Sequence, residues 1–508
     1  MSMEREQKLF DAITEIRDDL IERAQDLKIN SAHIKWGSWS IVAACAVLVV
    51  CLGGIMFWQN LFPFSGSAGS GGSGHADDSS VFMSYAGPVF PLTLAEADDK
   101  ISASRNIAYD FSLADEDSLR VWGAQVRDSY VLSNHLEQER AISILYPFAG
   151  SFNELAEQMP IITVDGEIVS PTLHPGGYSG GFTGVYGAND PDGSSNIRQL
   201  DSWEGYKALL ESGSYQAGAF AAYPVLDQQV TVYSFTDFEA PLDEFDAATQ
   251  AITFTINPEK TTILTYGFNG GNYGEDGWRR LSYFVPNETR RESNEKYLVV
   301  IGDDIGEYTL QGYKNGATEK GNELDDVSVT ITRTKRVMSE VLDSIIKNFL
   351  SMYGGDQGLA VSEELFLGAV SEFMLKYGAL SDAVRDRYKF GMLEDMIIET
   401  KNLDRVFYLE FPVTIPAGGD ASIIASLHKQ PSYDFHGAGS DNVGIQGYDM
   451  VSRLGSNLDF ETVAAEVTSI ENIEIVRQNF GFDLSSGITE VNLDPAIEHY
   501  YLEIRMLN

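Results

Sequence analysis

The chain has 508 residues, of which 35 are Lys or Arg and 75 are Asp or Glu, so its formal net charge is −40. This acidity argues against a nucleic-acid-binding protein, because such proteins gain affinity through Lys and Arg contacts to phosphates. With 44% hydrophobic and 11% aromatic residues, the chain has more apolar surface than a disordered acidic tail, and we expect it to fold.

An apolar stripe runs along residues 1–36, which we predict to form a short amphipathic helix in the cytoplasm. Its members recur at steps of three or four residues, with charged side chains on the other faces: Leu9, Ile13, Ile16, Leu20, Ala24 and Leu27. Because a single helix has no core of its own, we expect this stripe to bind a partner protein. Self-association and a merely juxtamembrane helix are the alternatives.

The uncharged stretch over 37–58 predicts one transmembrane helix, because about 20 apolar residues cross the hydrocarbon core of a bilayer. Basic residues precede this stretch, and the first one after it is Lys100. The positive-inside rule therefore predicts a single-pass protein of the cell membrane, with a cytoplasmic N-terminus and an extracytoplasmic C-terminal region. Both cysteines, Cys45 and Cys51, lie within the stretch, so the exterior has no disulfide framework.

Composition divides the remaining chain into four parts. Residues 59–80 are rich in Gly and Ser, which is typical of a flexible linker. Over 81–336, short runs of β-branched and aromatic residues between turn formers predict a β-rich domain. Apolar residues at helical spacing predict a helical segment over 337–402. Strand patterns return over 403–508, where we prefer a separate C-terminal β-rich domain, the alternative being that these strands complete the first sheet.

The expected fold class is α+β, with a mainly antiparallel β-sandwich-like exterior and a helical insertion, besides the transmembrane and cytoplasmic helices. Antiparallel pairing is indicated by Asp165-Gly166, which separates two strand-like runs. Both central residues of such a two-residue turn take a positive φ, which Asp and Gly tolerate.

Three patterns in the exterior suggest chemistry. Ser179 lies in a G-x-S-x-G sequence over 177–181, but no strong strand precedes it and no helix follows, so a glycine-aromatic loop is the better interpretation. His428 and His436 lack the spacing of a zinc site. The stretch 189–196 lacks the Glu of an EF-hand, which leaves weak calcium binding as an alternative to an Asx-rich turn. We therefore expect no catalytic residue, no cofactor and no metal site.

The N-terminal part resembles a known group of proteins. Residues 9–24, LFDAITEIRDDLIERA, followed by IKWG at 34–37, are similar to the start of bacterial single-pass membrane anti-sigma-factor-like proteins. The resemblance implies an inner helix that holds a sigma factor and a variable outer domain, although the His-Cys-Cys motif of the zinc-binding class is absent. The stretches 127–134 and 142–148 resemble strand pairs of uncharacterised bacterial surface domains.

These expectations define one leading function and two alternatives. The leading function is a membrane-anchored extracytoplasmic sensor or binding protein with an unknown extracellular ligand, whose cytoplasmic helix holds a transcription regulator such as a sigma factor. The first alternative is a cell-surface adhesion or envelope-binding protein. The least favoured is an exterior serine hydrolase that uses Ser179.

Overall fold

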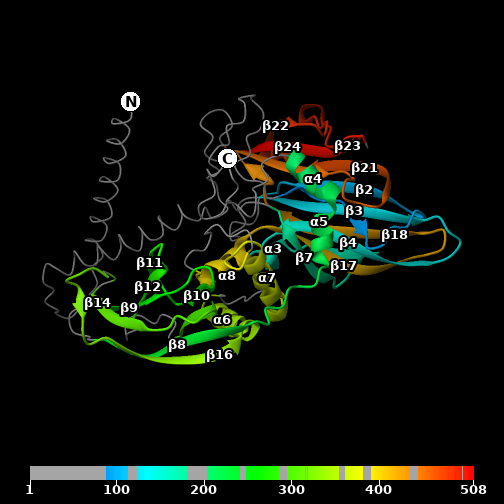
Figure 1. Cartoon of the computed structure of the whole chain (residues 1–508). Helices are drawn as coiled ribbons and strands as arrows, with labels where there is room; N and C mark the ends of the chain where they lie inside the picture. The colour runs from blue at the N-terminus through cyan, green and yellow to red at the C-terminus, as the bar shows by residue number, and fades with distance from the viewer. Residues whose placement is uncertain are drawn as a thin grey trace, which may run out of the picture. The chain divides into compact units, whose positions relative to one another are not determined.

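The computed structural model describes most of the second of two compact units, which comprises residues 64–508 (Figure 1). The described residues are 87–112, 123–179, 203–240, 248–285, 295–314, 316, 318–353, 361–381, 391–434, 444–494 and 496–507. Among them, 50% lie in strands and 18% in helices. Their strands form five sheets, and every pair of named strands is antiparallel except β2 and β21.

The largest sheet of the described part has seven strands. In order across the sheet, they are β23 (Glu490–Asn492), β21 (Asp459–Thr468), β2 (Ile101–Asp110), β3 (Ala124–Asn134), β18 (Asp420–Lys429), β5 (Ile161–Val164) and β6 (Glu167–Ile168). β5 and β6 form the hairpin predicted at Asp165-Gly166, whose φ values are 50° and 87°. Along β2, buried residues alternate with half-buried ones, so one face of this sheet points to a core and the other points outward.

Two four-stranded sheets share the core of the seven-stranded sheet. The first contains β1 (Thr93–Leu94), β4 (Arg140–Gly150), β17 (Arg405–Ile415) and β7 (Thr172–Tyr178). The second contains β19 (Tyr433–Asp434), β20 (Ile445–Val451), β24 (His499–Met506) and β22 (Ile473–Gln478). Two 3₁₀ turns, η1 (Ile470–Asn472) and η2 (Leu484–Ser486), flank β22 in the sequence.

A β-sandwich is inserted between β7 and β17 in the sequence. Its four-stranded sheet contains β10 (Thr261–Tyr266), β13 (Lys296–Gly302), β8 (Gln229–Glu239) and β16 (Ser328–Val337). Its five-stranded sheet contains β11 (Gly270–Tyr273), β12 (Trp278–Phe284), β9 (Ala248–Thr255), β14 (Tyr308–Lys314) and β15 (Glu323–Leu324). Phe235 and Val300 from one sheet share a core with Ile252 and Tyr283 from the other.

Six described α-helices complete the fold. They are α3 (Leu155–Gln158), α4 (Trp203–Ser212), α5 (Ser214–Ala219), α6 (Met338–Tyr353), α7 (Glu363–Lys376) and α8 (Leu393–Asn402). The last three form the helical segment expected over 337–402. The α7 helix begins at a capping residue, Ser362, whose side chain accepts a hydrogen bond from the Leu365 N–H at 3.2 Å. Apolar residues of α6 such as Leu342 and Ile345 are fully buried.

The C-terminal strands belong to the same sheets as the N-terminal ones. β17 lies between β4 and β7, β18 lies between β3 and β5, and β21 pairs with β2. This arrangement corrects the preference for a separate β-rich domain over 403–508. The strand patterns were visible in the sequence, but these partners are more than 220 residues away, and local patterning carries no information about such pairing.

The expected fold class also needs correction. Within the described ranges, the chain is mostly antiparallel β-sheet, rather than α+β. No helix in the part of the chain that the structure describes is long and apolar enough to cross a membrane. The expected single-pass membrane protein and its placement in the cell membrane are therefore not supported by the described residues. The stretches predicted as a cytoplasmic helix, a transmembrane helix and a linker, 1–36, 37–58 and 59–80, lie outside the described residues.

Candidate functional site

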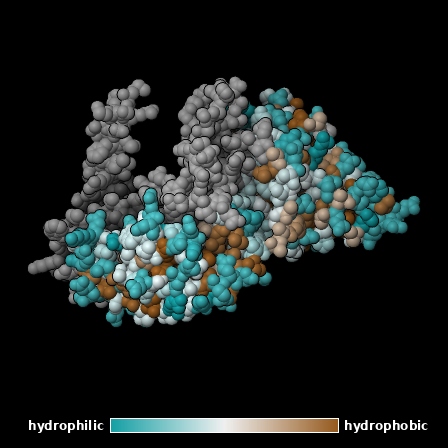
Figure 2. Space-filling model, viewed as in Figure 1, coloured by the Kyte–Doolittle hydropathy of each residue, from teal (hydrophilic) through white to brown (hydrophobic). Residues whose placement is uncertain are grey.

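A polar hollow on the outer face of the seven-stranded sheet is the best candidate for a functional site. In the view of Figure 2, hydrophilic residues cover much of the described surface and hydrophobic ones are scattered between them. The hollow has a volume of about 510 Å³. Its lining residues come from β2, β3, β18 and β21: Asn106, Ala108, Asp110, Gln125, Val126, Arg127, Ser129, Ser426, Glu466 and Thr468. This volume falls in the usual range for small-molecule sites.

The strand register places a small residue between two opposite charges. Ala108 of β2 is paired with Arg127 of β3 on one side and with Glu466 of β21 on the other. Ser426 of β18 lies beyond Arg127 in the same row. Because paired residues on a sheet point to the same face, these four side chains share the outer face. The methyl group of Ala108 leaves room between its long neighbours, which explains the hollow.

The two charged groups beside Ala108 are not neutralised by their surroundings. Neither Arg127 nor Glu466 forms an ion pair or a side-chain hydrogen bond with another residue in the described ranges. One row along the sheet, Asn106 is paired with Ser129, and its Oδ1 atom is buried without a hydrogen-bond partner. Buried polar atoms of this kind are uncommon, because an unmet hydrogen bond costs about 1–3 kcal/mol. The hollow therefore offers a cation and a carboxylate to a ligand, next to a buried amide oxygen that has no partner.

The next row of the sheet is fixed by its own hydrogen bonds. Asp110 Oδ1 accepts hydrogen bonds from Ser469 Oγ at 2.6 Å and from the Ser112 N–H at 2.9 Å. Burial raises the pKa of Asp110, but these hydrogen bonds outweigh it and hold the pKa below its ordinary value. Gln125 Nε2 lies 3.2 Å from His428 Nδ1, within hydrogen-bond distance. This row forms a polar wall that is already ordered without a ligand.

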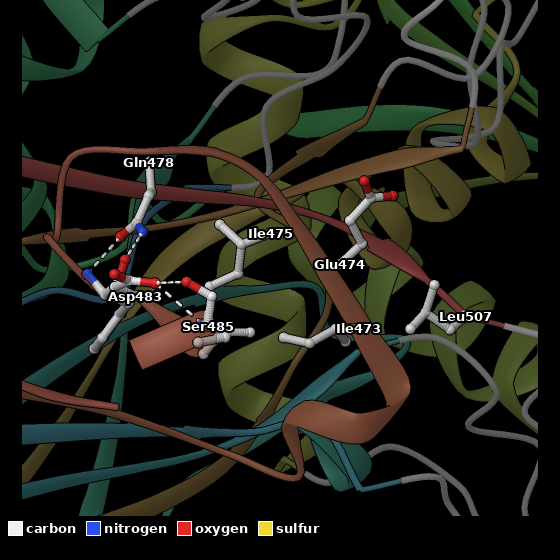
Figure 3. A pocket seen from close by; sticks show the side chains of 9 residues that line it. Ile473, Glu474, Ile475, Gln478, Asp483, Ser485 and Leu507 are labelled. Atoms are coloured by element: carbon white, nitrogen blue, oxygen red, sulfur yellow. Dashed lines mark hydrogen bonds between the residues drawn. The ribbon is translucent and has the colours of Figure 1, made fainter. Parts of the chain in front are cut away.

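A second hollow, also of about 510 Å³, lies beside β22 and η2 (Figure 3). Its polar groups already form hydrogen bonds or ion pairs with other groups of the protein. Asp483 accepts hydrogen bonds from the Ser485 and Ser486 hydroxyls at 2.6 Å each, which lowers the pKa of Asp483 to about 2. Gln478 bonds to the backbone of Phe482, and Glu474 pairs with Arg505 at 3.0 Å. This hollow therefore has fewer free polar groups than the one on the seven-stranded sheet.

Ser179 does not form a catalytic site in the structure. It is fully buried at the end of β7, and its backbone N–H donates to the Asp404 carbonyl at 2.9 Å. Its Oγ atom makes no hydrogen bond of good geometry, although the Tyr206 hydroxyl lies nearby. The preceding glycines serve packing, because a Cβ at Gly176 would lie 2.4 Å from the Val406 carbonyl oxygen. The expected glycine-aromatic loop is thus a strand up to residue 178.

Two Ser, His and Glu clusters that the sequence did not reveal come together across strands. Ser102 Oγ lies 2.8 Å from His135 Nε2 and donates to Glu461 Oε1 at 2.7 Å. A hydrolytic triad needs the histidine between the serine and the acid, bonded through its two ring nitrogens. Here the carboxylate lies on the same side as Nε2, at 3.7 Å, so this cluster does not have the order of a triad.

The second cluster has the carboxylate in the middle. Glu410 Oε1 accepts a hydrogen bond from Ser143 Oγ at 2.8 Å, while its Oε2 atom lies 2.9 Å from His174 Nε2. His174 does not activate the serine in this order, because the two residues bond to Glu410 and not to each other. All three residues come from paired strands, so the cluster stabilises the pairing of β4, β17 and β7.

The remaining predicted sites are not tested by the structure. The partner-binding residues of the N-terminal stripe, Leu9 to Leu27, lie outside the described residues, as do the calcium-like stretch 189–196 and His436. The described residues contain no group of three or more His, Cys, Asp or Glu side chains that could hold a metal ion. No family model, no curated protein and no solved structure matches this chain.

Proposed function

We propose that this protein is a binding protein that holds a polar ligand on the outer face of the seven-stranded sheet. The observation that carries the proposal is the pair of free opposite charges, Arg127 and Glu466, on either side of Ala108. On an ordinary solvent-exposed sheet, such long side chains reach toward one another across a small neighbour. Here they leave a hollow of about 510 Å³ between polar walls.

The rigidity of the site supports binding over a passive surface. The lining residues of β2, β3 and β18 stand on long paired strands rather than on loops. A preformed site loses little conformational entropy when a ligand binds, which favours affinity. Of the expected sensor function, this site can support the binding of a ligand. The role of the N-terminal stripe in holding a regulator stays a prediction.

A substitution that fills the hollow tests the proposal. Ala108→Trp places a large side chain between Arg127 and Glu466, and it should fold because Ala108 is half-buried and points outward. The matched control is Val131→Trp, which lies on the same face of β3 but four residues from Arg127, about 13 Å along the strand. Val131 is already 43% exposed.

The measurement is ligand-observed NMR on the full chain with a library of small polar molecules. We expect molecules that bind the wild type to lose their signal with Ala108→Trp and to keep it with Val131→Trp. Binding that survives Ala108→Trp would place the ligand elsewhere and contradict the proposal. Absence of any binder to the wild type would contradict it as well.

A further inference from the structure

We infer that the ligand of this hollow is a short peptide with a free ammonium group and a free carboxylate, an inference that rests on the proposed function. Arg127 offers a guanidinium, whose fork of N–H donors matches a carboxylate. Glu466 offers an unpaired carboxylate on the other side of Ala108, which suits an ammonium group. Each end of a free peptide therefore finds the opposite charge.

The spacing of the two charges selects the length of the peptide. Arg127 and Glu466 stand two strands apart, so their Cα atoms are separated by about 10 Å. Because a hollow remains between them, the two side chains do not lean together over Ala108, and their charged ends can lie farther apart than their Cα atoms. An extended dipeptide spans about 7 Å, and a hydrogen bond of about 3 Å at each end brings the total to about 13 Å. A dipeptide therefore fits the row better than a single amino acid, whose two charges are too close together.

The uncharged groups of the hollow fit the middle of such a ligand. A peptide bond has one N–H donor and one carbonyl acceptor. The hydroxyls of Ser129 and Ser426 can accept from this N–H or donate to this carbonyl.

Two other classes of ligand fit the charges less well. A multiply charged anion such as a phosphate would face Asp110 and Glu466 as well as Arg127, in a chain whose net charge is −40. A simple cation would face the guanidinium of Arg127. None of the described residues that line the hollow is aromatic, so a ligand that requires a ring for stacking finds none among them.

The test titrates dialanine into the full chain by isothermal calorimetry, with two blocked peptides as controls. N-acetyl-dialanine lacks the ammonium group and dialanine amide lacks the carboxylate, so both should bind about tenfold more weakly, the loss of one charge-assisted pair. Arg127→Gln should weaken dialanine by about the same factor while leaving dialanine amide unchanged. Glu466→Gln should weaken dialanine similarly and leave N-acetyl-dialanine unchanged.

Several outcomes separate this inference from the proposed function. If dialanine amide binds the wild type as well as dialanine does, the site attracts cations only and the inference is overturned. If dialanine does not bind, yet another polar molecule binds and is lost with Ala108→Trp, the binding proposal stands and the peptide inference fails. If Ala108→Trp leaves the binding of every molecule unchanged, both fail.

Discussion

The buried ion pair between Arg105 and Asp128 lies in the same strands as the hollow but faces the core, and both side chains are fully buried. Asp128 accepts four hydrogen bonds. Arg105 Nε and Nη2 donate to its two oxygens at 2.8 Å and 2.9 Å, and the hydroxyls of Tyr130 and Tyr146 donate at 2.6 Å and 3.2 Å. Burial lowers the pKa of Arg105, but Asp128 and the two tyrosines together raise it by a larger amount. The pKa therefore lies above its ordinary value, and the guanidinium stays charged.

Replacing Asp128 with Asn tests whether this pair holds the sheets together. Asn keeps the shape of the side chain but leaves the buried guanidinium without its counter-charge. The loss of one partner of a buried pair costs about 3–5 kcal/mol. Arg105 also donates through Nη1 to the carbonyl of Val451 at 2.5 Å, so the charge joins β2 to the end of β20. We expect Asp128→Asn to lower the free energy of unfolding by about that amount in equilibrium urea denaturation.

Arg405 provides the matched control, because it is equally buried but differently surrounded. None of its three guanidinium nitrogens makes a hydrogen bond of good geometry, and its Nη1 atom lies 4.0 Å from Glu372 Oε2, at the limit of an ion pair. It lies 4.9 Å from the Phe152 ring centre and 4.3 Å from that of Tyr178. Met can keep the contacts with these rings, and Glu372 keeps its ion pair with Lys376 at 2.6 Å, so we expect Arg405→Met to change the stability by less than about 1.5 kcal/mol. A loss below about 1 kcal/mol for Asp128→Asn, or equal losses for both variants, would refute the reasoning.

Two further predictions concern titration and chemistry. Burial raises the pKa of Glu394 to about 7 from 4.5, so the folded state holds a proton that the unfolded state loses, and stability should fall as the pH rises through this window. In urea denaturation at pH values below and above this window, Glu394→Gln should lose up to about 3 kcal/mol less stability than the wild type as the pH rises. An equal decline in both proteins would disprove the prediction. Because Ser179 is buried, Ser179→Ala should leave stability unchanged or slightly higher, and a fluorophosphonate should not label the wild type. Labelling of the wild type that disappears in Ser179→Ala would instead support the serine hydrolase alternative.

The sequence predicted local structure well because turns and helices depend on nearby residues. The hairpin at Asp165-Gly166 forms with both residues at positive φ. The apolar residues that predicted α6, including Val341, Ile346 and Phe349, are all buried. In both cases a period of 2 or 3.6 residues, or a turn-forming pair, is enough to specify the element.

The sheet order and the hollow could not be predicted in the same way. The parallel pairing of β2 with β21 joins residues about 360 positions apart, such as Ala108 and Glu466. No local pattern indicates such a pair. β2 does show a signal in its alternation of Ile107 and Tyr109 with small or polar residues, which is typical of a strand with one outer face. Only the register shows that Ala108 separates two charges.

The two faces of β2 have separate physical roles, and this separation matters for any binding site on a sheet. On the inner face, Arg105 and Tyr109 are fully buried and pack against the core. On the outer face, Asn106 and Ala108 contribute to the hollow and little to that core. Because neighbouring residues on a strand point in opposite directions, the strand can be fixed by one set of side chains while the other set stays unpaired. Unmet polar groups such as Asn106 Oδ1 cost stability, and the buried network beneath them is what allows the fold to retain them. Substitutions on the outer face should therefore change binding without unfolding the sheet, whereas Asp128→Asn acts on the fold itself.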